Sequence, residues 1–267
     1  MGSKLLRKVP EVTIFFWIVK VLTTAFGESL SDFLVHIMNP IIAVGIGAVG
    51  FTVAMIFQLR VRKYIAWIYW FAIAMVAVFG TMAADVVHIG LGVPYLYSTI
   101  FFAVVLIIIF ALWYAVEKTL SIHSIYTFRR ELFYWATVCA TFALGTAAGD
   151  MTAITLNLGY LESGALFGVV ITFITATHYA ARGILTLEHK HQSRNAVLAF
   201  WLAYVFTRPL GASFADWMGK AHEFGGIGWG DGTVSVDLAL LIVAFVWYLA
   251  ATHEDVEEGH PVAQTYL

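Results

Sequence analysis

Residues Trp201 to Asp216 read WLAYVFTRPLGASFAD, and the spacing of three of these residues recurs along the chain. A tryptophan is followed ten residues later by a glycine, and an aspartate follows five residues after that. The other three copies begin at Trp17, Trp70 and Trp135, and none of them needs a gap. Because self-similarity of this kind marks a repeated structural unit, the pattern predicts four equivalent elements.

The composition indicates the class of protein. Of the 267 residues, 61% are hydrophobic and only 12% are charged, and the mean hydropathy is +0.84. Soluble domains carry about 25% charged residues, and several apolar stretches here approach the ~20 residues that cross a bilayer as a helix. The sequence therefore predicts an all-α integral membrane protein that is surrounded by a lipid bilayer.

Polar loops and breaks at glycine or proline divide the apolar sequence into eight predicted spans. We expect them at residues 12–38, 41–59, 65–89, 95–116, 132–156, 160–181, 196–218 and 234–251, with the seventh interrupted at Pro209. They pair into four two-helix repeats, at about 9–60, 61–117, 128–182 and 194–253. Residues 1–267 then form a single transmembrane domain that ends in an acidic cytoplasmic tail, residues 254–267.

The lysine and arginine residues predict the orientation. Nearly all of them lie in the N-terminal segment and in the loops after the second, fourth and sixth spans, whereas the opposite loops carry only Lys220. Since cytoplasmic loops are rich in these residues, both termini are expected in the cytoplasm and the four repeats run parallel. The simplest packing places the odd-numbered helices at the centre, where the repeat glycines allow close approach.

Three short stretches, Thr207–Ser213, Leu144–Ala147 and Glu117–His123, accompany the four tryptophan repeats. Together they resemble a family of bacterial inner-membrane proteins that is named for a repeat of unknown function. The resemblance implies a multi-pass protein of the bacterial inner (plasma) membrane with eight spans. It implies no activity, so the function has to be inferred from the residues.

Polar residues recur at every fourth position of the first predicted helix. The set is Lys20, Thr24, Glu28, Asp32 and His36, within an otherwise apolar segment. Residues four apart share one helix face, so this stripe covers about 24 Å at about 1.5 Å per residue. Ionisable groups at membrane depth are costly and usually mark a transport path or a proton relay. The stripe therefore predicts a polar face that is turned towards the protein interior.

The equivalent faces of the other repeats carry matching polar residues. They are Thr81, Asp85 and His88 in the third span, Thr146 and Asp150 in the fifth, and Arg208, Asp216 and Lys220 in the seventh. A carboxylate at the C-terminal end of a helix opposes the helix dipole, and the spacing from the tryptophan is constant. Both facts favour a functional role over ordinary helix ends. We therefore expect Glu28 and the four aspartates to converge.

Such a set of side chains suits a metal cation. Carboxylate and hydroxyl oxygens are hard donors that bind Mg²⁺, Mn²⁺ or Ca²⁺, and nearby histidines shift the preference towards Mn²⁺, Fe²⁺, Zn²⁺ or Ni²⁺. The predicted metal ligands are Glu28, Asp32, Asp85, Asp150, Asp216, His36 and His88. A deep base, Lys20 or Arg208, is expected to pair with Glu28 when no cation is bound. Thr24, Thr81 and Thr146 complete the predicted transport set.

The sequence thus predicts a membrane transporter for a small cation, with a divalent metal such as manganese favoured as substrate and proton exchange left open. Three alternatives remain: a zinc-dependent intramembrane hydrolase, a haem-binding electron carrier with paired histidines, and a passive channel. An enzyme is less favoured because histidines are few at the predicted outer ends and differ between repeats. No resident cofactor and no nucleic-acid partner is expected, and the oligomeric state is not predicted.

Overall fold

The computed structural model describes residues 7–184 and 189–256. Their long helices are α1 (Ile14–Ile37), α2 (Pro40–Arg60), α3 (Ala66–Asp85), α4 (Tyr95–Glu117), α5 (Phe128–Asp150), α6 (Tyr160–Ile184), α7 (His189–Gly219) and α8 (Asp231–Thr252). All eight are long and apolar enough to cross a membrane. The predicted all-α fold with eight spans is therefore confirmed. Most of the predicted acidic tail, residues 257–267, lies outside the described residues.

Local sequence sets several of the helix starts. The hydroxyl of Thr13 accepts a hydrogen bond from the backbone N–H of Phe16 at the start of α1. Asn39 caps α2 through the N–H of Ile41, and Pro40 occupies its first turn. Such side-chain caps satisfy N–H groups that have no partner within the helix. Proline has no backbone N–H group, so it leaves none unsatisfied in the first turn. The break predicted at residues 39–40 is therefore a helix boundary.

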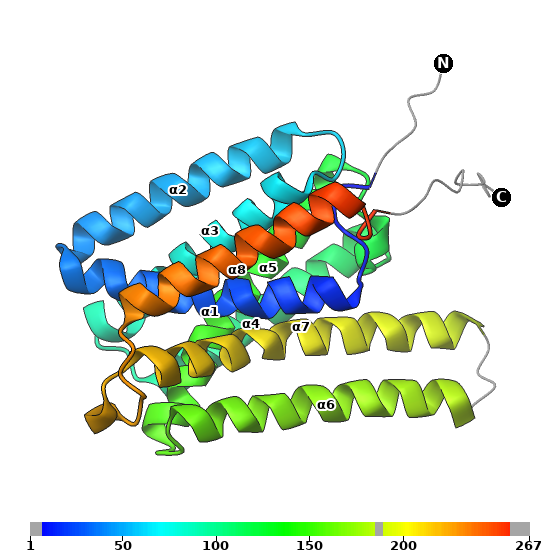
Figure 1. Cartoon of the computed structure of the whole chain (residues 1–267). Coiled ribbons are helices and arrows are strands. Elements are labelled where there is room, and N and C mark those ends of the chain that lie inside the picture. Colours follow the sequence, from blue (N-terminus) through cyan, green and yellow to red (C-terminus); the bar gives the residue numbers. More distant parts are fainter. Residues whose placement is uncertain (1–6, 185–188, 257–267) are drawn as a thin grey trace.

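The four odd-numbered helices form the centre of the molecule. Between 56% and 67% of the residues in their apolar windows are buried, against 11% to 28% in the even-numbered helices. In Figure 1, α2 and α6 lie at opposite edges of the bundle. Each outer helix packs mainly against the central helix of the following repeat, and α8 packs against α1. The predicted arrangement of central and outer helices is therefore confirmed, and it closes into a ring.

The four repeat glycines lie where neighbouring central helices cross. A Cβ atom added at each would meet the next repeat at 3.0 Å or less: Gly27 at Ala77, Gly80 at Phe142, Gly145 at Arg208 and Gly211 at Thr24. Each partner stands seven positions after the tryptophan of its own repeat. The glycines therefore permit close helix contact, as predicted. The fourth crossing joins the last repeat back to the first.

The prediction that the seventh span is interrupted at Pro209 is wrong. Helix α7 runs without a break from His189 to Gly219 with the proline inside it. A proline removes one helix hydrogen bond, but a membrane helix tolerates it where neighbouring helices pack around it. The space for Pro209 comes from Gly145 and Gly149 of α5, whose missing Cβ atoms would lie 3.0 Å and 3.6 Å from it.

Two π-helical turns that the sequence did not reveal follow equivalent positions. Helix α3 ends at Asp85 and continues as the turn η1 (Val86–Gly90), and α5 ends at Asp150 and continues as η3 (Met151–Thr155). The first and fourth repeats have no such turn after their aspartates within the described residues. Because π-helical turns occur frequently at functional sites, these two mark the same end of the bundle as a region of interest.

The opposite end of the bundle, here called the terminal end, holds both ends of the described chain (Figure 1). The backbone N–H of Glu11 donates to the carbonyl of Asp255 at 2.9 Å, and that of Tyr64 donates to Arg7 at 2.9 Å. The ammonium of Lys8 pairs with the buried carboxylate of Glu131. The segment before α1 therefore lies across the terminal end and joins parts of several repeats.

Candidate cation site

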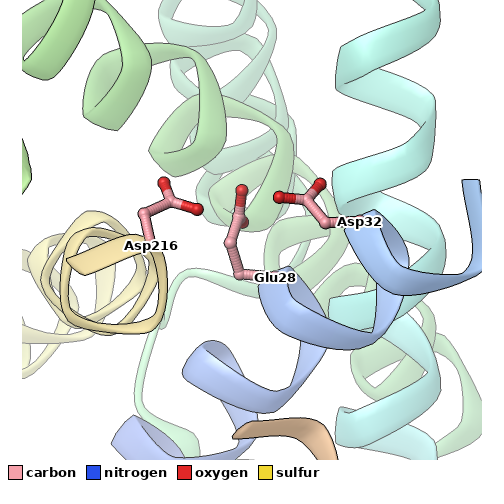
Figure 2. Close-up of side chains that lie close together, drawn as sticks. All are labelled: Glu28, Asp32 and Asp216. Carbon is pink, nitrogen blue, oxygen red and sulfur yellow. The ribbon is translucent and has the colours of Figure 1, made fainter. Parts of the chain in front are cut away.

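Three carboxylates meet in the half of the bundle away from the terminal end. Glu28 and Asp32 lie one turn apart on α1, and Asp216 lies on α7. One oxygen of each lies within 4.8 Å of one oxygen of both others. Figure 2 shows Glu28 between the two aspartates, with the three carboxyl groups turned towards one another. Like charges at this spacing repel, and the repulsion is relieved by positive charge beside the group or by a proton on one carboxylate.

Arg208 supplies one positive charge. Its side chain is fully buried, and its Nη2 donates to the Glu28 carboxylate at 2.6 Å. The same nitrogen donates to the hydroxyl of Thr146 at 2.8 Å and to that of Thr81. A residue of the fourth repeat thus contacts all the other repeats through equivalent positions of α1, α3 and α5. The Nε and Nη1 atoms of Arg208 hydrogen-bond to none of the described residues.

Lys20, the other deep base, does not pair with Glu28. Its side chain is fully buried, and its ammonium lies over the rings of Phe142 and Tyr204, at 4.0 Å and 4.3 Å from their centroids. Cation–π attraction of this kind stabilises a charge in place of water. No hydrogen-bond partner for the Lys20 ammonium is found in the described part of the chain. Of the two predicted bases, only Arg208 reaches the glutamate.

Lys220 supplies a second positive charge, and the sequence interpretation did not include it among the site residues. Its ammonium pairs with Asp32 and lies 3.4 Å from an oxygen of Asp231 and 3.7 Å from one of Asp216. Burial alone lowers the pKa of Lys220, but the charges of these aspartates raise it above its ordinary value. A signal was present in the sequence, since Lys220 is the single basic residue of the loops opposite the termini.

Asp85 and Asp150 lie outside the group of three. Both are partly buried, stand at the position of Asp32 and Asp216 in their repeats, and interact electrostatically with Glu28. The π-helical turns η1 and η3 begin directly after them. The four aspartates therefore belong to one level of the bundle, but the group of three within 4.8 Å combines carboxylates of the first and fourth repeats.

The two predicted histidines and Thr24 have other contacts. His36 is exposed, and its Nδ1 bonds to the carbonyl oxygen of Asp32 at 2.8 Å. His88 is buried, and its Nδ1 bonds to the hydroxyl of Ser98 at 3.0 Å. Thr24 donates to backbone carbonyls of its own helix and of α7, so it supports the crossing at Gly211. The clustered ligands are therefore all oxygens, which favours a hard cation such as Mg²⁺, Mn²⁺ or Ca²⁺.

These features define the class: a membrane protein of four tandem two-helix repeats whose central helices enclose buried charged residues. The family described as "Repeat of Unknown Function (DUF347)" matches residues 15–64, 68–119, 133–183 and 199–255. The chain belongs to this family, and the predicted relationship is confirmed. No curated protein and no solved structure matches the chain. The description of the family supplies no activity.

Proposed function

We propose that this protein is a transporter for a divalent metal cation such as Mn²⁺. The observation that carries the proposal is the grouping of Glu28, Asp32 and Asp216, whose oxygens lie within 4.8 Å of one another in the interior of a membrane protein. Ionisable residues at membrane depth usually mark an ion pathway. Three carboxylate ligands on two helices also match the hard-donor preference of Mn²⁺.

We infer that the protein lies in the bacterial inner membrane with both termini in the cytoplasm. The inference rests on the concentration of lysine and arginine in the loops at the terminal end. In this orientation the carboxylate group faces the periplasm, and residues 7–13 cover the cytoplasmic end of the bundle. A cation enters at Asp32 and Asp216 and then reaches Glu28.

Glu28 and Arg208 form the switch of the proposed cycle. With no cation bound, the guanidinium neutralises the glutamate at 2.6 Å. An entering divalent cation competes for the same carboxylate, and Arg208 then keeps its bonds to the hydroxyls of Thr81 and Thr146. Because a bare buried charge is costly, exchange of one positive partner for another keeps the glutamate paired at each step.

Lys20 is the proposed coupling residue for proton exchange. Its fully buried ammonium belongs to a residue one helical turn nearer the terminal end than the level of Arg208, and its close partners are two aromatic rings. Lysine in such a place gives up its proton more readily than arginine. At the level of Lys20 the equivalent positions of the other repeats are filled by the buried side chains of Ile73, Val138 and Tyr204. The next level towards the terminal end is filled by those of Phe16, Tyr69 and Tyr134. This packing favours a transporter with alternating access over a permanently open channel.

Uptake of Mn²⁺ into liposomes tests the proposed function. The protein is reconstituted with a Mn²⁺-quenched dye trapped inside, and Asp216→Asn, Asp85→Asn and Asp150→Asn are compared with the unaltered chain. Removing the charge of Asp216 from the group of three, or that of Asp85 or Asp150 at the same level, is expected to slow uptake at least about tenfold. A tenfold change in rate corresponds to only ~1.4 kcal/mol. Each variant must elute and melt as a folded protein.

Asp237→Asn is the matched control, because Asp237 is an exposed aspartate of α8 and lies outside the carboxylate group. This variant is expected to transport at the rate of the unaltered chain. If the Asp216, Asp85 and Asp150 variants all take up Mn²⁺, Mg²⁺ and Ca²⁺ at undiminished rates, the acidic group is not a transport site and the proposal fails.

A further inference from the structure

The loop after α7 carries a cation into the acidic group. We propose that Lys220 is a tethered cation: its ammonium occupies the outer part of the site when no metal ion is bound, and an entering metal ion has to displace it. This inference rests on the proposed function, because it assigns a competitor to the same carboxylates. Lys220 then sets the affinity of the site for the metal ion, and displacement of its ammonium opens the site.

The contacts of the ammonium are those of a bound cation. It pairs with Asp32 and lies 3.7 Å from Asp216, which are two of the three clustered carboxylates. Asp231, at the start of α8, is the third carboxylate acceptor, with an oxygen at 3.4 Å. The side chains of Lys220 and Asp32 are 20% and 21% exposed, whereas that of Glu28 is 5% exposed. The ammonium therefore lies between Glu28 and the more accessible side of the site.

The backbone of Lys220 is held by hydrogen bonds of its own, which do not depend on its ammonium. Its own N–H donates to the carbonyl of Asp216 at 2.8 Å, and its carbonyl accepts from Gly228 at 2.9 Å. Ile227, Trp229 and Gly230 bond back to the last turn of α7 in the same way. The loop thus holds the Cα atom in place, while the flexible four-carbon stem of lysine allows its ammonium to swing away.

Competition of this kind lowers the apparent affinity for the metal. If Lys220 leaves the site open for about a tenth of the time, the apparent dissociation constant is about tenfold higher than that of the open site. Removing the ammonium without changing the carboxylates is expected to recover this factor.

Binding of Mn²⁺ to the purified protein, followed by electron paramagnetic resonance of the free ion, tests the inference. The half-saturating Mn²⁺ concentration is expected to fall about tenfold in Lys220→Gln and not to fall in Lys220→Arg, which keeps a cation in the site. Lys63→Gln is the control for net charge, because Lys63 is exposed in the loop after α2. Unchanged or weaker binding by Lys220→Gln, beside a wild-type chain that binds Mn²⁺, overturns the tethered cation and leaves the proposed transport site standing.

A second measurement uses the unaltered chain and does not depend on the folding of a variant. Mn²⁺ is added before labelling with an amine-reactive reagent, and the Lys220 peptide is quantified by mass spectrometry. A displaced ammonium is no longer held by carboxylate oxygens and is free to meet the reagent, so it reacts faster. Mn²⁺ is therefore expected to raise the labelling of Lys220 several-fold and to leave Lys63 unchanged. Equal labelling with and without bound Mn²⁺ overturns the inference. If neither the unaltered chain nor Lys220→Gln binds Mn²⁺, the proposed function is overturned as well.

Discussion

Gly27→Ala tests the helix crossing on which the position of Glu28 depends. The new Cβ would lie 2.4 Å from the Cβ of Ala77 and 2.7 Å from its backbone carbonyl carbon. Backbone cannot turn aside as a side chain does, so α1 and α3 have to separate. Ordinary contact begins near 3.4 Å, which requires a movement of about 1 Å.

The size of the effect follows from two opposing terms. Forcing an extra methyl into a packed contact costs about 1–3 kcal/mol, and a backbone clash lies at the upper end of that range. Replacing glycine by alanine within a helix returns about 1 kcal/mol. The free energy of unfolding is therefore expected to fall by about 2 kcal/mol, which corresponds to a melting temperature lower by about 4–8 °C for a chain of this size.

Thermal unfolding in one detergent and at one heating rate, followed by far-ultraviolet circular dichroism, measures this change. Gly45→Ala in α2 is the matched control, because no atom lies within 4 Å of the added Cβ, and its melting temperature is expected to stay the same or rise. Separation of α1 and α3 also moves Glu28 from Thr81, 3.4 Å away, so Mn²⁺ uptake should slow. Equal melting temperatures for the Gly27→Ala variant and the unaltered chain would refute the steric argument.

Two further predictions concern buried charges. In Glu131→Gln the ammonium of Lys8 faces two neutral amides, the new one at position 131 and that of Gln58. Breaking a buried ion pair costs about 3–5 kcal/mol, so the melting temperature should decrease strongly in the same experiment. An unchanged melting temperature would contradict the role of residues 7–13 as a cover. Lys20→Met removes a buried ammonium without a hydrogen-bond partner in the described residues, so the free energy of unfolding should rise by about 1–3 kcal/mol. Mn²⁺ uptake by this variant should no longer respond to an imposed pH gradient, and a retained response would show that Lys20 is not the coupling residue.

The spacing of tryptophan, glycine and aspartate carried most of the information about the fold. A constant spacing in four apolar segments implies four equivalent helices, and glycine at one level implies that those helices touch there. Trp70 and Trp135, for example, are buried beside the aromatic residues that precede them. Hydropathy located the spans because no water is available within a bilayer to satisfy an open backbone.

The details of the candidate site depend on features that periodicity does not contain. Arg208 starts at the level of Phe142, but its long side chain reaches the level of Glu28 and Thr146. Lys220 comes into the site through a loop whose hydrogen bonds fold it back onto α7. The orientation of His36 away from the carboxylates is likewise set by a bond to its own helix. Side-chain reach and loop closure are tertiary properties, so a helix stripe predicts only the level of a residue and not its partner.

The departure from fourfold symmetry explains why the charges gather between the first and fourth repeats. Eleven positions after the tryptophans stand Glu28, Thr81, Thr146 and Ala212, so one acid occupies a level that could not bury four. Arg208 balances it across the crossing where Gly211 meets Thr24. A cation that replaces Arg208 as the partner of Glu28 acts at this one crossing, because the other three hold no ion pair between the residues at these levels. The contact of α1 with α7 is therefore where the empty and the cation-loaded forms of the proposed transporter should differ most.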